Sequence, residues 1–171
     1  MAKRQRKQTG FSLIELLVTV TVILIIAAIA VPNYMSSRMA ANEGSAVASL
    51  RTISTALVIY TTNYPLVGYA PDLVSLGDGG STANCAPNVI AVPTSACLID
   101  TALSHDPVNK NGFQITYSPD ASQVPSGTYT IHADPTSRGV TGRRSFFTDQ
   151  PGVIRWNATA AATATDPPIP M

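Results

Sequence analysis

The sequence predicts an α+β fold in which one long N-terminal α-helix packs on a small four-stranded antiparallel β-sheet. Three observations lead to this prediction. An apolar stretch fills residues 11–31, apolar residues then recur at helical spacing as far as residue 64, and apolar and polar residues alternate in much of 112–156. The 171 residues suffice for a single domain of ordinary size.

The first ten residues are basic, and the next 21 are almost entirely apolar. Residues 1–10 hold four Lys or Arg residues and no acid, whereas residues 11–31 hold one charged residue, Glu15. As a helix, 21 residues measure about 31 Å, against about 30 Å for the hydrocarbon core of a bilayer. The basic flank predicts that residues 1–10 stay in the cytoplasm and that everything after the span is exported. A secretory signal peptide, cut near the small residues 27–30, is the alternative.

Glu15 is an acidic residue in an apolar segment. A carboxylate inside a membrane helix costs about 2.5–3.5 kcal/mol on insertion scales, so such a group usually has a partner. A cut between Gly10 and Phe11 would create an α-ammonium group four residues before Glu15. The two charges would then neutralise each other, within one chain or between neighbouring chains. Alternatively, Glu15 lies close enough to the helix end to reach the membrane interface.

The residues at the two ends of the apolar stretch form a specific pattern with the basic leader. They are Gly10-Phe11-Ser12-Leu13-Ile14-Glu15-Leu16-Leu17 and Ala30-Val31-Pro32-Asn33-Tyr34. This pattern resembles the N-terminus of type IV prepilins and of type II secretion pseudopilins. The resemblance implies that a prepilin peptidase cuts after Gly10, that the amine of Phe11 is N-methylated and that Glu15 serves in filament assembly. It also implies the same helix-on-sheet fold.

The resemblance further implies a set of partners and a location. The mature protein would wait in the inner membrane, among lipid, as a single-pass protein with a cytoplasmic N-terminus. An assembly ATPase and an inner-membrane platform protein would then move it into a homo-oligomeric helical filament. That filament would be an extracellular pilus or a periplasmic pseudopilus.

Pro32 falls inside the predicted helix. Proline removes one backbone hydrogen bond and kinks or loosens the preceding turn. Pro32 therefore either marks the exit from the membrane or lets the span bend when it packs. Residues 32–64 form the amphipathic half of the helix, and the Tyr64-Pro65 pair ends it at about residue 63.

The amphipathic half has an apolar and a polar face. The apolar face is formed by Leu50, Ile53, Leu57, Tyr60 and Tyr64. The more polar side is predicted to hold Arg38, Glu43 and Arg51.

Residues 65–111 are predicted to form an irregular connection, because Pro, Gly, Ser, Asn and Asp recur in them. Short helical turns are expected at 70–77 and 95–103. Cys85 and Cys97 lie on the exported side, where disulfides persist, so we expect a structural disulfide worth roughly 3 kcal/mol. Two thiols without a Cys-x-x-Cys motif argue against a metal site.

The sheet is predicted within residues 112–156, and residues 157–171 are predicted to form a flexible or extended tail. Strands are expected at 113–117, 129–133, 145–148 and 153–156, with a hairpin turn at 149–152.

No residue pattern predicts catalysis, a cofactor or a metal. Ser104, His105 and Asp106 are consecutive, and consecutive side chains rarely converge into a catalytic triad. The acids are dispersed, so that Asp134 and Asp149 are only isolated calcium candidates. We therefore predict a structural protein rather than an enzyme.

The charge balance argues against a nucleic-acid-binding surface. Outside the leader there are 7 basic residues against 10 acids. Arg138, Arg143 and Arg144 form a small basic set, interpreted as a solvated turn or as a contact to an acidic neighbour or to DNA.

The leading function is that of a type IV pilus subunit. The alternatives are a type II secretion pseudopilin and, from another class, a membrane-anchored exported binding or enzymatic domain.

Overall fold

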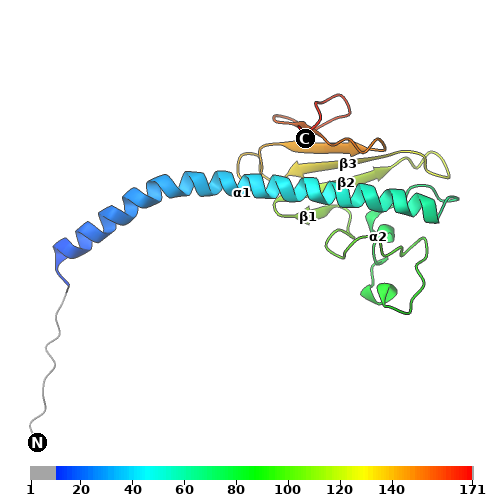
Figure 1. Cartoon of the computed structure of the whole chain (residues 1–171), viewed down its shortest axis with the longest axis horizontal. Helices are drawn as coiled ribbons and strands as arrows, with labels where there is room; N and C mark the ends of the chain where they lie inside the picture. The colour runs from blue at the N-terminus through cyan, green and yellow to red at the C-terminus, as the bar shows by residue number, and fades with distance from the viewer. Residues whose placement is uncertain (1–10, 171) are drawn as a thin grey trace, which may run out of the picture. The chain divides into compact units, whose positions relative to one another are not determined.

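The computed structural model describes residues 11–170 (Figure 1). The chain divides into two units, Met1–Ser37 and Arg38–Met171, and helix α1 (Leu13–Asn63) belongs to both. All other elements lie in the second unit. They are α2 (Leu73–Leu76), the 3₁₀ helix η1 (Thr82–Cys85), β1 (Val108–Lys110), β2 (Phe113–Pro119), β3 (Tyr129–Pro135), β4 (Ser145–Asp149) and β5 (Arg155–Asn157). The predicted α+β class is confirmed.

The part of α1 in the first unit exposes nearly every side chain. Among residues 11–37, Ala27 alone is half-buried and the others are exposed. By its length and composition α1 is able to cross a membrane. The helix continues through Pro32, and the kink expected there stays a prediction.

In the second unit, α1 buries one face against the rest of the unit. Leu50, Ile53, Leu57 and Tyr60 are fully buried at the predicted helical spacing. Burial of a large apolar side chain contributes about 1.5–3 kcal/mol, so this stripe fixes the helix to the sheet. The helix ends at Asn63, and Pro65 follows two residues later.

The sheet is antiparallel throughout, with the strands in the order β1-β2-β3-β4-β5. Its buried positions alternate as predicted along β2 and β3, and the buried residues Ile115 and Ala133 pair with each other. The sheet has five strands rather than the predicted four. The last strand is Arg155–Asn157, slightly beyond the expected 153–156.

Strand β1 is the one that the prediction missed. Val108–Lys110 contains a single apolar residue, so it has no alternation of apolar and polar residues that would predict a strand. The turn that follows it consists of Asn111 and Gly112, which both have positive φ (49° and 72°). An Asn-Gly pair is a strong signal for a two-residue hairpin turn, so the sequence did carry the information.

The prediction for the connection between α1 and the sheet is corrected in one place. Helix α2 lies within the turn expected at 70–77, and Asp72 caps it by accepting the N–H of Ser75 (2.6 Å). The segment 95–103 is not helical, because its N–H groups bond to the end of α2. Cys97 donates to Gly77 (2.8 Å) and Leu98 to Leu76 (2.9 Å). The Cys85–Cys97 disulfide is confirmed.

The segment after β5 makes contacts that its composition did not predict. The N–H of Ile169 donates to Ile154 (2.9 Å), the N–H of Trp156 donates to Pro167 (3.1 Å), and Ala162 is fully buried. Backbone pairing beside β5 thus holds part of the expected flexible or extended tail, although this segment has few apolar side chains.

Candidate functional site

The described chain begins at a helix start that contains the one acid of the apolar stretch. Ser12 directly precedes the first helical residue, and its N–H donates to the Glu15 carboxylate (Oε2, 2.9 Å). This is one half of a capping box, in which the acid three residues after the cap satisfies a free N–H group. The carboxylate also lies at the positive end of the helix dipole.

The partner expected for Glu15 from the sequence was an amine, and this cap was not predicted. The Ser-x-x-Glu signal at residues 12–15 was readable without the structure. Phe11, which would carry the new amine, directly precedes Ser12 and is 83% exposed. Gly10, the other half of the predicted cleavage site, lies outside the described residues.

The polar side chains within the apolar stretch bond to the helix itself. The hydroxyl of Thr19 donates to Leu16 (2.8 Å), and the hydroxyl of Thr21 donates to Val18 (2.8 Å). Back-bonding of this kind satisfies the hydroxyl group without water. The first unit thus presents an apolar surface around a helix whose threonine hydroxyls are paired internally.

Helices that are apolar on all sides are buried in a large core or in a membrane. Among the described residues of the first unit, the apolar side chains of this helix are exposed: Leu13 is 88% exposed, Ile23 63% and Ile29 66%. Its length and apolar composition are those of a membrane span.

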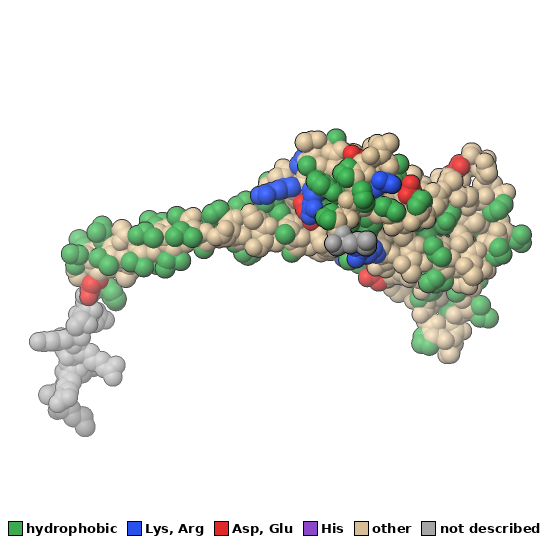
Figure 2. All heavy atoms as spheres, turned by 45° about the horizontal axis from the view of Figure 1, so that its top comes forward, with side chains coloured by type: hydrophobic (Ala, Val, Ile, Leu, Met, Phe, Trp, Pro, Cys, Tyr) green, Lys and Arg blue, Asp and Glu red, His purple; other side chains and the backbone are tan. Residues whose placement is uncertain are grey.

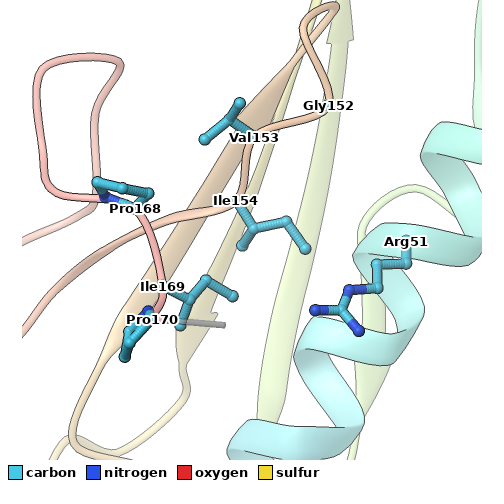
Figure 3. A pocket seen from close by; sticks show the side chains of 7 residues that line it. All are labelled: Arg51, Gly152, Val153, Ile154, Pro168, Ile169 and Pro170. Carbon is cyan, nitrogen blue, oxygen red and sulfur yellow. The ribbon is translucent and has the colours of Figure 1, made fainter.

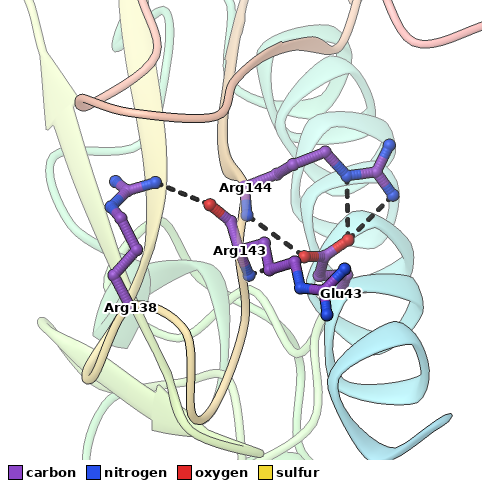
Figure 4. A network of polar contacts seen from close by, with 4 residues as sticks. All are labelled: Glu43, Arg138, Arg143 and Arg144. Carbon is purple, nitrogen blue, oxygen red and sulfur yellow. Dashed lines mark hydrogen bonds and ion pairs between the residues drawn. The ribbon is translucent and has the colours of Figure 1, made fainter. Parts of the chain in front are cut away.

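The second unit contains a buried acid, Glu43, on the face of α1 that packs on the sheet (Figure 4). Its Oε1 accepts the N–H groups of Arg143 (2.7 Å) and Arg144 (3.1 Å), and its Oε2 accepts the Arg144 guanidinium (2.8 Å). Burial by itself raises the pKa of Glu43, but these donors outweigh it and hold the pKa below its ordinary value. The prediction that Glu43 lies on the polar side of the helix is wrong.

The basic set around residues 138–144 bonds within the chain, although Arg138 and Arg143 are exposed and Arg144 is half-buried. Arg138 donates to the carbonyl oxygens of Arg143 (2.8 Å) and Ala158 (3.0 Å) and to the Ser145 hydroxyl (2.6 Å). The Arg144 guanidinium lies over the rings of Phe146 and Trp156. The turn is exposed at Arg138 and Arg143, as expected of a solvated turn, but the guanidinium groups of Arg138 and Arg144 also bond within the chain.

A groove of about 410 Å³ opens between α1 and the C-terminal segment (Figure 3). Arg51 is the one charged residue in its wall, and Gly152, Val153, Ile154 and the segment 168–170 complete it. Such a wall supplies no pair of acid and base for proton transfer.

The residues considered for catalysis or calcium do not come together. Ser104 is buried and donates to Asp78 (3.2 Å), whereas His105 is exposed. Asp149 pairs with Thr130 in the sheet, so Asp134 lies four positions, about 13 Å, further along β3. Among residues 11–170 no three His, Cys, Asp or Glu side chains are placed to hold a metal ion.

An apolar helix that begins with a capped carboxylate and continues onto an antiparallel sheet defines a pilin-like class of protein. The family model described as the prokaryotic N-terminal methylation motif matches residues 5–31. Three curated relatives are similar beyond this motif.

The relatives come from pili and from secretion systems. The type IV wide pilus major component PilA4 of Thermus thermophilus is 32% identical over 96 residues, which are 55% of this chain and 73% of the relative. Type II secretion system core protein G is 38% identical over 58 residues in Vibrio cholerae and 33% over 57 residues in Aeromonas hydrophila. These matches cover 34% and 33% of this chain.

The aligned part spans 40% of the length of each secretion protein. No solved structure matches the chain. The match to most of the pilus component shows that the chain belongs to the type IV pilin family, together with the related pseudopilins.

Proposed function

We propose that the protein is the structural subunit of a type IV pilus-like filament, polymerised through its N-terminal helix. The observation that carries the proposal is the exposed apolar helix of the first unit with Glu15 at its start. A structural role also agrees with the relatives, whose names describe a pilus component and a secretion-system core protein.

Before assembly, lipid covers the helix; after assembly, the same helix of other copies covers it. Both environments are apolar, and transfer between them keeps the apolar surface away from water. The protein thus starts as a single-pass inner-membrane protein with the basic leader in the cytoplasm. An assembly ATPase and a platform protein of the inner membrane move it into the filament.

Processing prepares the charge on which assembly depends. A prepilin peptidase cuts between Gly10 and Phe11, and the new amine of Phe11 is N-methylated. Because Phe11 precedes Ser12, the amine forms within about one helical turn of the Glu15 carboxylate that Ser12 holds. The carboxylate is then neutralised by an amine of its own chain or of a neighbour.

The test combines mass spectrometry with electron microscopy of cells that produce the full chain. We expect a mature protein that starts at Phe11 and carries one methyl group, and fibres that disappear in Glu15→Leu. The Glu15→Leu protein should still enter the membrane and form the Cys85–Cys97 disulfide. A mature chain that starts at Met1, or normal fibres from Glu15→Leu, would contradict the proposal and favour a membrane-anchored domain.

A pseudopilus of a type II secretion system is the second candidate, because two of the relatives are secretion core proteins. Deletion of the gene separates the two uses. Loss of surface fibres supports a pilus, whereas intact fibres with exoproteins retained in the cell support a pseudopilus.

A further inference from the structure

The second unit has two ends that differ in charge. One end, the basic end, consists of residues 38–46, 109–113 and 134–145. Hydrogen bonds join these segments: the amide of Asn42 donates to Thr141 (2.9 Å), and the amide of Asn111 donates to Ser45 (2.8 Å).

The opposite end, the acidic end, consists of residues 64–106, 117–129 and 149–153. Strand β2 runs from Phe113 at the basic end to Pro119, which pairs with Tyr129 at the acidic end. The N–H of Tyr69 donates to Ser126 (3.0 Å) and ties the connection after α1 to the turn between β2 and β3.

The count of charges in these segments is strongly unequal. The basic end has five Lys or Arg residues and two acids: Arg38, Lys110, Arg138, Arg143, Arg144, Glu43 and Asp134. The acidic end has six acids and no Lys or Arg: Asp72, Asp78, Asp100, Asp106, Asp120 and Asp149. On the face seen in Figure 2, Lys and Arg side chains lie toward one end of this unit and none is seen at the other.

Part of this charge faces solvent. Glu43 neutralises Arg144, but Arg143 at the basic end is exposed, and Lys110 is half-buried. Neither Lys110 nor Arg143 forms an ion pair with another described residue. At the acidic end, Asp100 and Asp106 are exposed.

We propose that the basic end of one copy binds the acidic end of another copy in the filament. The inference rests on the proposed function. A contact between two different, complementary surfaces of one subunit does not close on itself and generates an open helical array. In a filament built on parallel N-terminal helices all copies have the same polarity, so the basic end of one copy faces the acidic end of the next.

Charge complementarity gives this contact its register. Opposite potentials across an interface speed encounter and exclude wrong alignments, because like charges placed face to face cost several kcal/mol. An anionic membrane surface would also attract the basic end, but it would leave the six acids at the other end without a role. A second copy of the chain accounts for both ends, because each end then faces a surface of opposite charge.

The test uses charge reversal at one end and its suppression at the other, in cells that produce the full chain. Lys110→Glu with Arg143→Glu turns the basic end into one with three bases and four acids. Facing six acids, this variant should give at least about tenfold less sheared fibre than the wild type. The control, Lys110→Arg with Arg143→Lys, keeps the charge and should give the wild-type yield.

Adding Asp106→Lys and Asp149→Lys to the charge-reversed variant removes much of the repulsion at the acidic end. We expect this combination to recover most of the lost fibre. Circular dichroism and disulfide formation of each full-length variant in detergent confirm that it is folded, so that loss of fibre reports on assembly.

Three results would overturn the inference. They are a wild-type fibre yield from the reversed variant, no recovery of fibre by the combination, and loss of binding to anionic lipid vesicles as the only defect of the reversed variant. Failure of the proposed function is recognised separately, because in that case the wild type gives no fibres, or the Glu15→Leu variant gives normal fibres.

Discussion

Glu43 and Arg144 are 101 residues apart in the sequence, yet Nε of Arg144 donates a hydrogen bond of 2.8 Å to Oε2 of Glu43, and Nη2 of Arg144 forms an ion pair with the same oxygen at 2.8 Å. The other oxygen accepts the backbone N–H groups of Arg143 and Arg144. Helix α1 and the start of β4 are thereby joined by one acid that is 6% exposed. Both carboxylate oxygens of Glu43 accept hydrogen bonds, which offsets the cost of burying the charge.

Glu43→Leu should destabilise the second unit by about 1–3 kcal/mol, because it leaves buried N–H groups without an acceptor. Arg144 is partly exposed and can turn to water, which limits the loss. Glu43→Gln keeps one acceptor oxygen and should lose less. Urea unfolding of the full chain in detergent measures both variants, and equal stability of wild type and Glu43→Leu would refute the structural role.

The same acid predicts a dependence of stability on pH. The donors around Glu43 hold its pKa below the ordinary value, so the folded state binds its proton less readily than the unfolded state. The stabilisation is complete above the ordinary Glu pKa of about 4.3 and is lost as pH falls through the lower folded value. The difference in unfolding free energy between wild type and Glu43→Gln should therefore shrink as the pH falls below about 4. A difference that stays constant from pH 7 to pH 3 would contradict this.

Glu15→Gln separates the charge of Glu15 from its hydrogen bond. The amide oxygen can still accept the N–H of Ser12, so the helix start should be kept, but the amine of Phe11 loses its counter-charge. If neutralisation of that amine drives assembly, Glu15→Gln should lose fibres as fully as Glu15→Leu. Fibre counts in electron micrographs give the answer; Glu15→Asp, which keeps the charge, is the control and should retain more fibres than either variant.

Local patterns in the sequence predicted most of the fold. The helical spacing of Leu50, Ile53 and Leu57 and the alternation along β2 each depend on a single element, and both are present in the structure. Strand β1 was missed because three residues with one apolar side chain carry little periodicity.

The polar contacts were much less predictable, because they depend on which distant segments meet. The sequence places Glu43 among polar residues of a helix, and only the tertiary fold brings Arg143 and Arg144 to it. The cap at Ser12 and Glu15 was predictable from spacing alone. The hydrogen bonds of Arg138 were not, since its carbonyl acceptors include Ala158 in a segment with no periodicity.

Removal of the disulfide should destabilise the connection between α1 and the sheet. Cys85 and Cys97 are separated by 12 residues, and the chain-entropy model assigns roughly 3 kcal/mol to a loop of this size. Cys85→Ser with Cys97→Ser should therefore lower the unfolding free energy by about this amount. Dithiothreitol should have the same effect on the wild type and none on the double variant. A wild type that is insensitive to the reductant, once loss of the disulfide is verified by thiol labelling, would contradict the prediction.

Gly142→Ala should destabilise the second unit because there is no room for a methyl group. A Cβ atom at Gly142 would lie 2.5 and 2.7 Å from two ring atoms of Phe113, which is itself fully buried. Forcing an extra carbon into packed space costs about 1–3 kcal/mol, since the ring has to leave its preferred position. Gly127→Ala is the matched control, because a Cβ atom there meets nothing within 4 Å. Thermal unfolding of the two full-length variants should show a lower midpoint for Gly142→Ala alone, and equal midpoints would mean that the Phe113 ring moves aside without cost.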